Sequence, residues 1–181
     1  AMFNDPDIDI VYIATPHSFH YQNAYDALMA GKSVLCEKPI TISSEESKKL
    51  AALAKAQGLF LMEAMWTYFL PAIQQAKKWL DDGLIGKVKH IKADFGYPMP
   101  YNSEAREYKA EFAGGCLLDM GIYPLAIANY FIESPMSNLL VKSHLAPNGV
   151  DDDVIILADA GNVKLTLATS FQCKLPNWAY I

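Results

Sequence analysis

The sequence has only three cysteines, no CxxC pair and no basic stripe. Cys36, Cys116 and Cys173 are widely spaced, which is typical of reduced thiols in the cytoplasm, where we expect this protein. The formal net charge of −5 argues against a nucleic-acid partner. No uninterrupted apolar run reaches the ~18 residues of a membrane span, and the polar amino terminus lacks a signal-peptide pattern. We therefore expect no membrane segment and no nucleic-acid binding.

The apolar content is sufficient for a packed core. Hydrophobic residues make up 52% of the 181 residues and charged residues 19%, which excludes an intrinsically disordered chain. A chain of this length suits one domain or one and a half. Neither internal repeats nor low-complexity segments interrupt it.

The first seventy residues alternate short apolar strands with helices. The pattern predicts strands at 8–14, 32–36 and 59–62 and helices at 18–30 and 44–57. Ser18 is placed to cap the first helix, and Ser43 and Ser44, which precede Glu45-Glu46, to cap the second, while Gly31 and Gly58 end them. This order indicates right-handed βαβ units on a parallel sheet of the doubly wound, Rossmann-like kind. The glycine-rich GxGxxG turn that normally opens such a sheet is absent, so we interpret residues 1–70 as its second half.

The remaining residues follow a different pattern. It predicts helices at 71–82 and 114–131 and strands at 87–95, 138–146, 154–158 and 163–171, with another strand starting near 177. Tight turns at Asn148-Gly149 and at 159–162 join the later strands, which favours an open, mainly antiparallel sheet. The predicted fold class is thus α/β followed by α+β, with domains at 1–70 and 71–181.

Two motifs carry candidate chemistry. The run Cys36-Glu37-Lys38-Pro39 closes a strand, and open α/β sheets place their ligands at the carboxyl ends of strands. Lys38 could orient a substrate hydroxyl, assist a nearby tyrosine or act as the base itself, for which its free pKa of about 10.4 would have to fall. The alternative is a surface lysine near a turn. For Glu37, a hydrogen bond to a ribose and a salt bridge to a lysine are both open.

The second motif is the glycine-led helix start from Gly114 to Tyr123. Asp119 and Tyr123 are four residues apart, so both project from one face of the helix. Together with a lysine, they form a plausible set for moving a proton on and off a sugar-like hydroxyl. Otherwise, Asp119 complements the helix dipole and Tyr123 is an amphipathic core residue.

Four motifs in order resemble one family. They are Ile13-Ala14-Thr15-Pro16-His17-x-x-His20, Glu37-Lys38-Pro39, Glu63-Ala64-Met65-Trp66 and Gly114-Gly115-x-Leu117-Leu118-Asp119-x-Gly121-Ile122-Tyr123. They resemble the glucose–fructose oxidoreductase/inositol dehydrogenase/MocA family, and within it the dihydrodiol dehydrogenase branch, which has tyrosine at the position of Tyr123. The resemblance covers essentially the whole chain.

The resemblance implies a fold, a reaction and a set of site residues. The family has an amino-terminal dinucleotide-binding domain and a carboxy-terminal domain whose open sheet commonly forms a dimer interface. Its members transfer hydride between NAD or NADP and a sugar or related alcohol, here a sugar or a cyclic diol. The implied roles are catalytic for Lys38, Asp119 and Tyr123, cofactor-binding for Thr15, Pro16, His17, His20, Glu37 and Lys38, and substrate-binding for Trp66 and Phe95.

Several of these residues have other interpretations. His17 and His20 are spaced as metal ligands could be, but no third ligand is evident, so we expect no metal. His20 could equally be an ordinary helix residue, and Trp66 and Phe95 could be core residues. Arg106 lies in a polar loop and could be a surface residue that contacts only water. Asp151-Asp152-Asp153 is interpreted as a charged strand entry.

Two departures from the family pattern matter. The chain starts near the family's fourth strand and stops inside its last sheet, so we expect this chain alone to bind dinucleotide poorly and to be nearly inactive. Tyr68 stands where relatives often have arginine, so a contact from that arginine is not assumed.

The alternative function is a non-catalytic dimerisation or binding module. A hydrolase using Cys36 is weaker still, because no paired base is evident.

Overall fold

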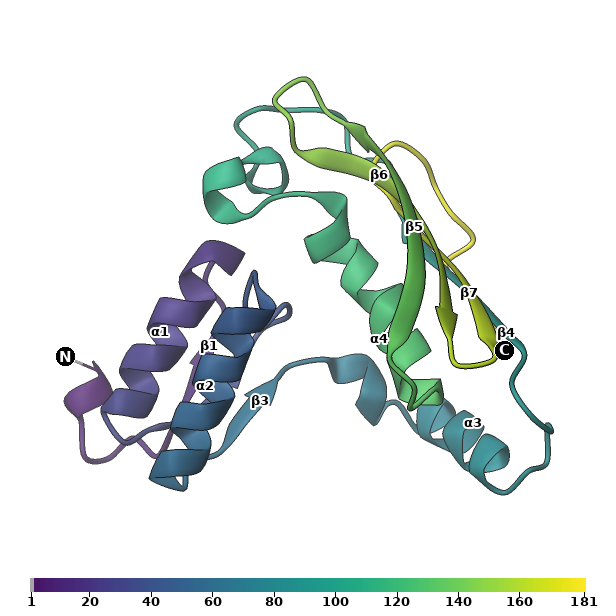
Figure 1. The fold of residues 1–181 in the computed structure, drawn as a ribbon. Coiled ribbons are helices and arrows are strands. Elements are labelled where there is room, and N and C mark those ends of the chain that lie inside the picture. Colours follow the sequence, from purple (N-terminus) through teal and green to yellow (C-terminus); the bar gives the residue numbers. More distant parts are fainter. Residues whose placement is uncertain (1) are drawn as a thin grey trace. The chain divides into compact units, whose positions relative to one another are not determined.

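A computed structural model describes residues 2–181, and its contacts divide the chain into two compact units (Figure 1). The first unit contains the chain up to Met65 together with Lys109–Gly114, and the second contains Trp66–Tyr108 and Gly115–Ile181. The predicted boundary lay at residue 70, whereas the contacts separate the units after Met65. The short return of 109–114 to the first unit had no counterpart in the predicted domains.

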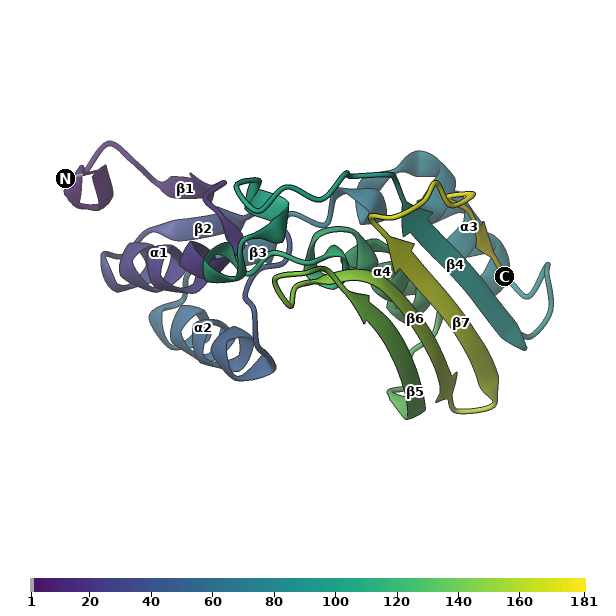
Figure 2. The same ribbon diagram turned by 90° about the horizontal axis from the view of Figure 1, so that it is seen from above.

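The first unit is a parallel sheet with strands in the order β1-β2-β3. Its strands are β1 (Ile10–Ile13), β2 (Ser33–Cys36) and β3 (Leu61–Glu63), and its helices are α1 (His17–Met29) and α2 (Ser44–Gln57). One face of the sheet packs on both helices, because Val11 and Val34 share one buried cluster with Leu28 of α1 and Leu50 of α2 (Figure 2). The predicted βαβ order on a parallel sheet is therefore confirmed.

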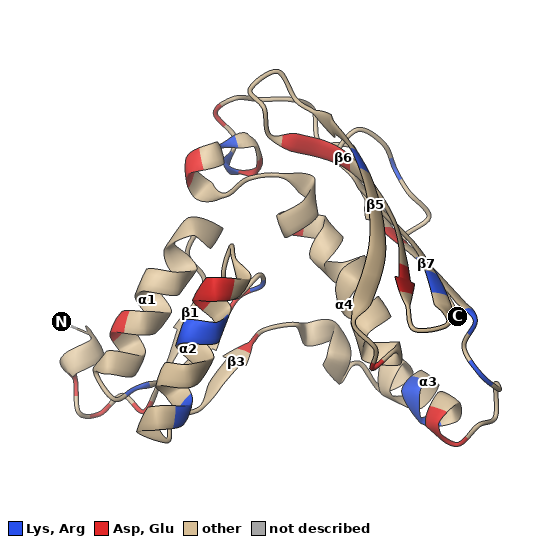
Figure 3. Cartoon of the chain, viewed as in Figure 1, with Lys and Arg blue, Asp and Glu red and all other residues tan. Residues whose placement is uncertain are grey.

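The two helices begin differently. The hydroxyl of Ser43 accepts a hydrogen bond from the Glu46 amide at 3.3 Å, so α2 is capped as predicted, and its acidic first turn suits the helix dipole (Figure 3). The prediction that Ser18 caps α1 is wrong, because α1 begins at His17 with Pro16 at its N-cap. Pro16 has no N–H that would need a partner, so the helix starts directly behind it. Ser18 instead lies inside the first turn.

The second unit is a five-stranded sheet in the order β5-β6-β7-β4-β8 (Figure 2). Its strands are β4 (His90–Gly96), β5 (Met136–Leu145), β6 (Asp151–Ala160), β7 (Val163–Ser170) and β8 (Ala179–Tyr180). Strands β5, β6 and β7 are antiparallel neighbours and β8 is antiparallel to β4, so the mainly antiparallel sheet is confirmed. Strands β4 and β7 are parallel, because a long connection and not a hairpin joins them.

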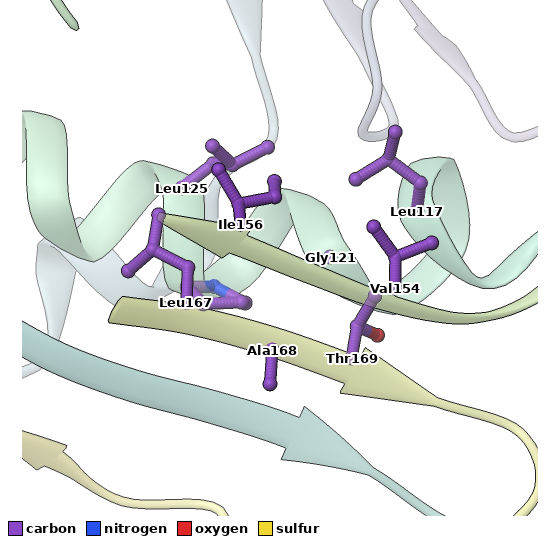
Figure 4. A pocket seen from close by; sticks show the side chains of 9 residues that line it. Leu117, Gly121, Leu125, Val154, Ile156, Leu167, Ala168 and Thr169 are labelled. Atoms are coloured by element: carbon purple, nitrogen blue, oxygen red, sulfur yellow. The ribbon is translucent and has the colours of Figure 1, made fainter. Parts of the chain in front are cut away.

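Helices cover one face of this sheet. They are α3 (Pro71–Asp81) and α4 (Ile122–Phe131), the latter preceded by a short π-helix (Leu117–Gly121). The apolar seam between the π-helix and strands β6 and β7 is closely packed around Gly121, Val154 and Thr169, with no volume left for water (Figure 4). An added Cβ at Gly121 would lie 3.0 Å from the Thr169 methyl, so a larger residue would require its neighbours to shift. This seam is therefore part of the core.

A π-helix replaces the regular helix start that we predicted at 114. Pro124 lacks an N–H, and in an α-helix its ring would crowd the carbonyl of Met120, so a wider turn directly before it relieves both conflicts. Asp151 of β6 supports the first turn, since its carboxylate accepts a hydrogen bond from the Leu117 amide at 2.7 Å. The turn that carries Asp119 is thus held by a residue of the sheet.

Among residues 2–181, one helical stretch, Ala110–Phe131, is long and apolar enough to count as a membrane-span candidate by length and composition. It contains Glu111 and Asp119, so it is not an uninterrupted apolar run, and the expected absence of a membrane segment stays a prediction. Its apolar residues have another explanation, because Met120, Ala128 and Phe131 belong to the buried core of the second unit. Backbone angles of φ +53° at Ala113 and +124° at Gly115 also interrupt it.

We expect Gly115→Ala to destabilise the protein more than Gly58→Ala. A Cβ at Gly115 would lie 2.2 Å from a carboxylate oxygen of Asp151, whereas one at Gly58 meets nothing within 4 Å, and both glycines have positive φ. The predicted losses in the free energy of unfolding are about 2–4 kcal/mol for Gly115→Ala and about 1 kcal/mol for Gly58→Ala. Urea denaturation measures both, and equal losses would show that the Asp151 contact is unimportant.

Candidate active site

The carboxyl ends of β1, β2 and β3 meet at one edge of the first sheet, as parallel strands require. Thr15 follows β1, Lys38 follows β2, and Glu63 ends β3. The Glu63 carboxylate accepts a hydrogen bond from the Ile40 amide at 2.8 Å, so β3 holds the segment that follows Lys38. The predicted ligand edge of the sheet therefore collects residues from all three strands.

Glu37 is bound on two sides. One carboxylate oxygen accepts a hydrogen bond from the Tyr12 hydroxyl and the other accepts from the Lys38 amide at 3.3 Å. The bond to Glu37 raises the pKa of Tyr12 above its ordinary value. We did not predict Tyr12, although strand alternation places it opposite Val11 and Ile13, on the face away from the helices.

The residues after β1 differ in exposure. Thr15 is exposed and accepts a hydrogen bond from the Asn23 amide group at 3.0 Å. His17 is buried, with its Nδ1 3.2 Å from the carbonyl oxygen of Ala113, which belongs to the same unit. His20 is fully buried, and both of its ring nitrogens lie 2.7 Å from backbone carbonyl oxygens. The direct cofactor contact predicted for His20 stays a prediction, and both of its ring nitrogens face backbone carbonyls.

In the second unit, Tyr123 meets both predicted substrate-binding residues. The indole N–H of Trp66 donates to the Tyr123 hydroxyl at 3.2 Å, and the ring of Phe95 lies 5.1 Å from that of Tyr123. Trp66 remains exposed, so the core interpretation does not apply to it. A 3-10 turn, the second residue of α4 and strand β4 thus supply one aromatic cluster.

Asp119 has a cationic neighbour that we did not predict. A guanidinium nitrogen of Arg106 lies 3.7 Å from the Asp119 carboxylate and 3.1 Å from that of Glu107. Asp119 is largely shielded, with 16% of its side chain exposed, so this charge contact is less screened than a surface pair. Arg106 is therefore more than a solvated loop residue. No short-range sequence pattern links 106 to 119, and only the tertiary structure brings them together.

Tyr68 has a packing role. Its ring stacks on Tyr130 at 4.9 Å, and its hydroxyl donates to the carbonyl of Ala126 at 3.2 Å. A tyrosine here braces α4, which carries Tyr123. Tyr68 therefore does not supply the positive charge that an arginine would bring to this position.

Comparison with known proteins identifies the class of this fold. Residues 1–65 match the family model described as "Oxidoreductase family, NAD-binding Rossmann fold", and residues 73–181 match the GFO/IDH/MocA C-terminal domain. The chain therefore belongs to the Gfo/Idh/MocA oxidoreductase family.

Its relatives include enzymes of two substrate types. It is 36% identical to trans-1,2-dihydrobenzene-1,2-diol dehydrogenase of Mus musculus over 98% of this chain and 53% of that protein. It is 43% identical to D-xylose 1-dehydrogenase (NADP(+)) of Hypocrea jecorina over 67% of this chain and 33% of that protein. The chain thus spans about half the length of the dihydrodiol dehydrogenases it matches.

Solved structures show the same fold. The aldose–aldose oxidoreductase of Caulobacter crescentus superposes with a TM-score of 0.88 at 26% identity, over 96% of this chain and 53% of that one. A 3-ketoreductase of Actinomadura kijaniata, solved with NADP and TDP-benzene, gives 0.86 at 30% identity, over 95% and 54%. The predicted family and fold class are confirmed.

The exposure of the three cysteines allows a test of the weakest alternative, a hydrolase that uses the Cys36 thiol. Cys36 and Cys116 are buried and Cys173 is exposed. Burial, with a smaller effect of Glu63, raises the pKa of Cys36 to about 12, and burial raises that of Cys116 as well. We therefore expect a thiol reagent near pH ~8 to modify one cysteine rapidly and the other two only after unfolding, since the thiolate is the reactive form. The variant Cys173→Ser should lose the rapid phase, and a rapid phase that survived it would reveal a reactive buried thiol.

Proposed function

We propose that the protein containing this chain is an NAD- or NADP-dependent dehydrogenase that acts on the CH–OH group of a sugar or cyclic diol. The observation that supports it most is the Tyr123 phenol held between Trp66 and Phe95 in a chain of this family. An aromatic wall beside a hydroxyl that can exchange a proton suits a hydroxylated ring as substrate. Relatives named for dihydrodiols and xylose agree with that class.

The first unit offers groups that suit the ribose end of a dinucleotide. The edge at the carboxyl ends of the strands presents the Thr15 hydroxyl, the Glu37 carboxylate and the Lys38 ammonium, of which the first is exposed and the others half-buried. Carboxylates and hydroxyls accept hydrogen bonds from ribose hydroxyls, so these side chains fit a ribose. When bound, the nicotinamide supplies the hydride chemistry. Thr15, Pro16, His17 and Glu37 would hold that cofactor.

Tyr123 is proposed as the group that takes the proton of the substrate hydroxyl. The indole nitrogen of Trp66 can only donate, so the phenol oxygen accepts from it and the phenol's own hydrogen points to another partner. The same indole N–H would stabilise the negative charge that develops on the oxygen when Tyr123 is deprotonated. Asp119, braced by Arg106, would orient the substrate. Lys38, which belongs to the first unit, keeps its predicted catalytic role as a proposal.

We further propose a homodimer through the outer face of the second sheet. The register places one set of side chains on the face away from α4: Leu140, Lys142, Ile155, Leu157, Thr166 and Ala168. Leu140, Ile155 and Leu157 are exposed although strongly apolar. Exposed apolar side chains grouped on one face of a sheet are typical of an interaction surface, and a second copy of the chain could cover them in an isologous dimer. The same face supports the second candidate function, a non-catalytic dimerisation module.

The activity test uses the protein expressed from its complete open reading frame, assayed by the absorbance of reduced nicotinamide with sugars and cyclic diols. Tyr123→Phe should lower kcat by about 10²–10⁴-fold, since it removes a general acid–base group and little volume. Tyr180→Phe, which alters an exposed tyrosine of β8, should leave the rate unchanged within about twofold. Full activity in Tyr123→Phe would refute the assigned role, and dimerisation without any dehydrogenase activity would favour the module.

The interface test compares two leucine substitutions. Leu140→Asp should shift the protein to monomers in sedimentation equilibrium, because it buries a charge in the proposed contact. Leu84→Asp alters a leucine that is equally apolar and exposed but lies in the turn after α3, so it should leave the dimer intact. Dimers that persist in Leu140→Asp would place the interface elsewhere.

A further inference from the structure

His20 connects the segments that follow two neighbouring strands. Its Nε2 lies 2.7 Å from the carbonyl oxygen of Thr15, just after β1, and its Nδ1 lies 2.7 Å from the carbonyl oxygen of Pro39, just after β2. The ring is fully buried, so both contacts are shielded from water. The other ring in contact with it is His17, whose centroid is 5.7 Å away on the same helix.

The geometry fixes the orientation of the ring. A flipped ring would place carbon atoms at these two positions, and C–H···O contacts are normally about 3.3–3.6 Å long. Both partners are carbonyl oxygens, which can only accept, so a ring nitrogen that carries a hydrogen donates to the carbonyl it faces.

The Pro39 carbonyl is one residue beyond Lys38. On the other side of Lys38, the Glu37 amide donates to the Ile13 carbonyl at 2.8 Å and so continues the sheet. Beyond Pro39, the Ile40 amide is held by Glu63. The backbone that carries Lys38 is therefore attached to the sheet before it, to His20 directly after it and to β3 one residue later.

We propose that His20 is a positioning residue that holds the backbone of Lys38 through the Pro39 carbonyl. This inference builds on the proposed function, in which the Lys38 ammonium acts at the reacting hydroxyl. A misplacement of about 1 Å at such a group can cost about 10²-fold in rate, so a buried tether beside it has a direct effect on turnover. A histidine that only fills the core would not need a particular nitrogen to face Pro39.

Two substitutions separate the two bonds. The amide nitrogen of asparagine lies near the position of histidine Nδ1 and that of glutamine near Nε2. His20→Asn therefore keeps the bond to Pro39 and loses the bond to Thr15, while His20→Gln does the reverse. Both variants replace the imidazole ring by a side-chain amide, so each is the control for the other. Thermal unfolding of both checks that they are folded.

The first measurement is amide hydrogen exchange in the 181-residue chain. The Ile40 amide should exchange at least about tenfold faster in His20→Gln and remain within about threefold of the parent rate in His20→Asn, because only the former releases the Pro39 segment. Equal rates in the two variants, or faster exchange in His20→Asn, would overturn the proposal. This measurement requires no activity, so it stands apart from the proposed function.

The second measurement is turnover of the complete protein. His20→Gln should lower kcat by about tenfold or more with KM nearly unchanged, and His20→Asn should keep most of the rate. If the exchange rates differ as expected but no dehydrogenase activity exists, the tether is supported and the proposed function fails. Should His20→Gln not fold, couplings across the hydrogen bonds from both ring nitrogens to the two carbonyl carbons, measured by NMR on the parent, decide it. A ring with no coupling from Nδ1 to the Pro39 carbonyl carbon would overturn the proposal.

Discussion

The carboxyl ends of parallel strands lie at one edge of a sheet, and the candidate chemistry of the first unit depends on this constraint. It brings the segments after β1, β2 and β3 close enough for direct backbone attachment. His20 contacts the first two segments and Glu63 holds the second. Three short strands would otherwise leave the loops mobile, since loops tolerate motion unless their backbone groups are bound. The buried tethers therefore turn a loop that carries Lys38 into a defined part of the sheet edge.

In the second unit, a side chain of the sheet fixes the segment that carries the candidate site residues. Here a helix start must present Asp119 and Tyr123, and helix starts leave amide groups without partners. Asp151 supplies a carboxylate from the sheet to the Leu117 amide, and Gly115 leaves room for it. The sulfur of Cys116 also donates to that carboxylate, at 3.4 Å. The Gly114-Gly115 pair and the acidic entry to β6 thus belong to one structural element.

The features that the sequence predicted well are those set by neighbouring residues. The cap at Ser43 and the stop at Gly58 depend on local backbone geometry, and both are present. Strand alternation likewise placed β4 to β7. The sequence pattern did not predict contacts between residues far apart in the chain. Examples are the ion pair of Arg106 with Asp119 and the hydrogen bond from Tyr12 to Glu37. The pattern also failed at the helix start before Pro124, where the chain adopts a π-helix that no hydrophobic period distinguishes from an α-helix.

The neighbours of Tyr123 narrow the role that this residue can have. A phenol buried only for packing needs one satisfied hydrogen bond, and the carbonyl of a nearby helix would be an adequate acceptor, as Ala126 is for Tyr68. Tyr123 accepts a bond from an indole, so the hydrogen of its own hydroxyl is directed to a group other than Trp66. The indole is exposed, and an exposed tryptophan beside a phenol contributes little to folding but much to a stacking surface. The two features together favour contact with a substrate over a core role.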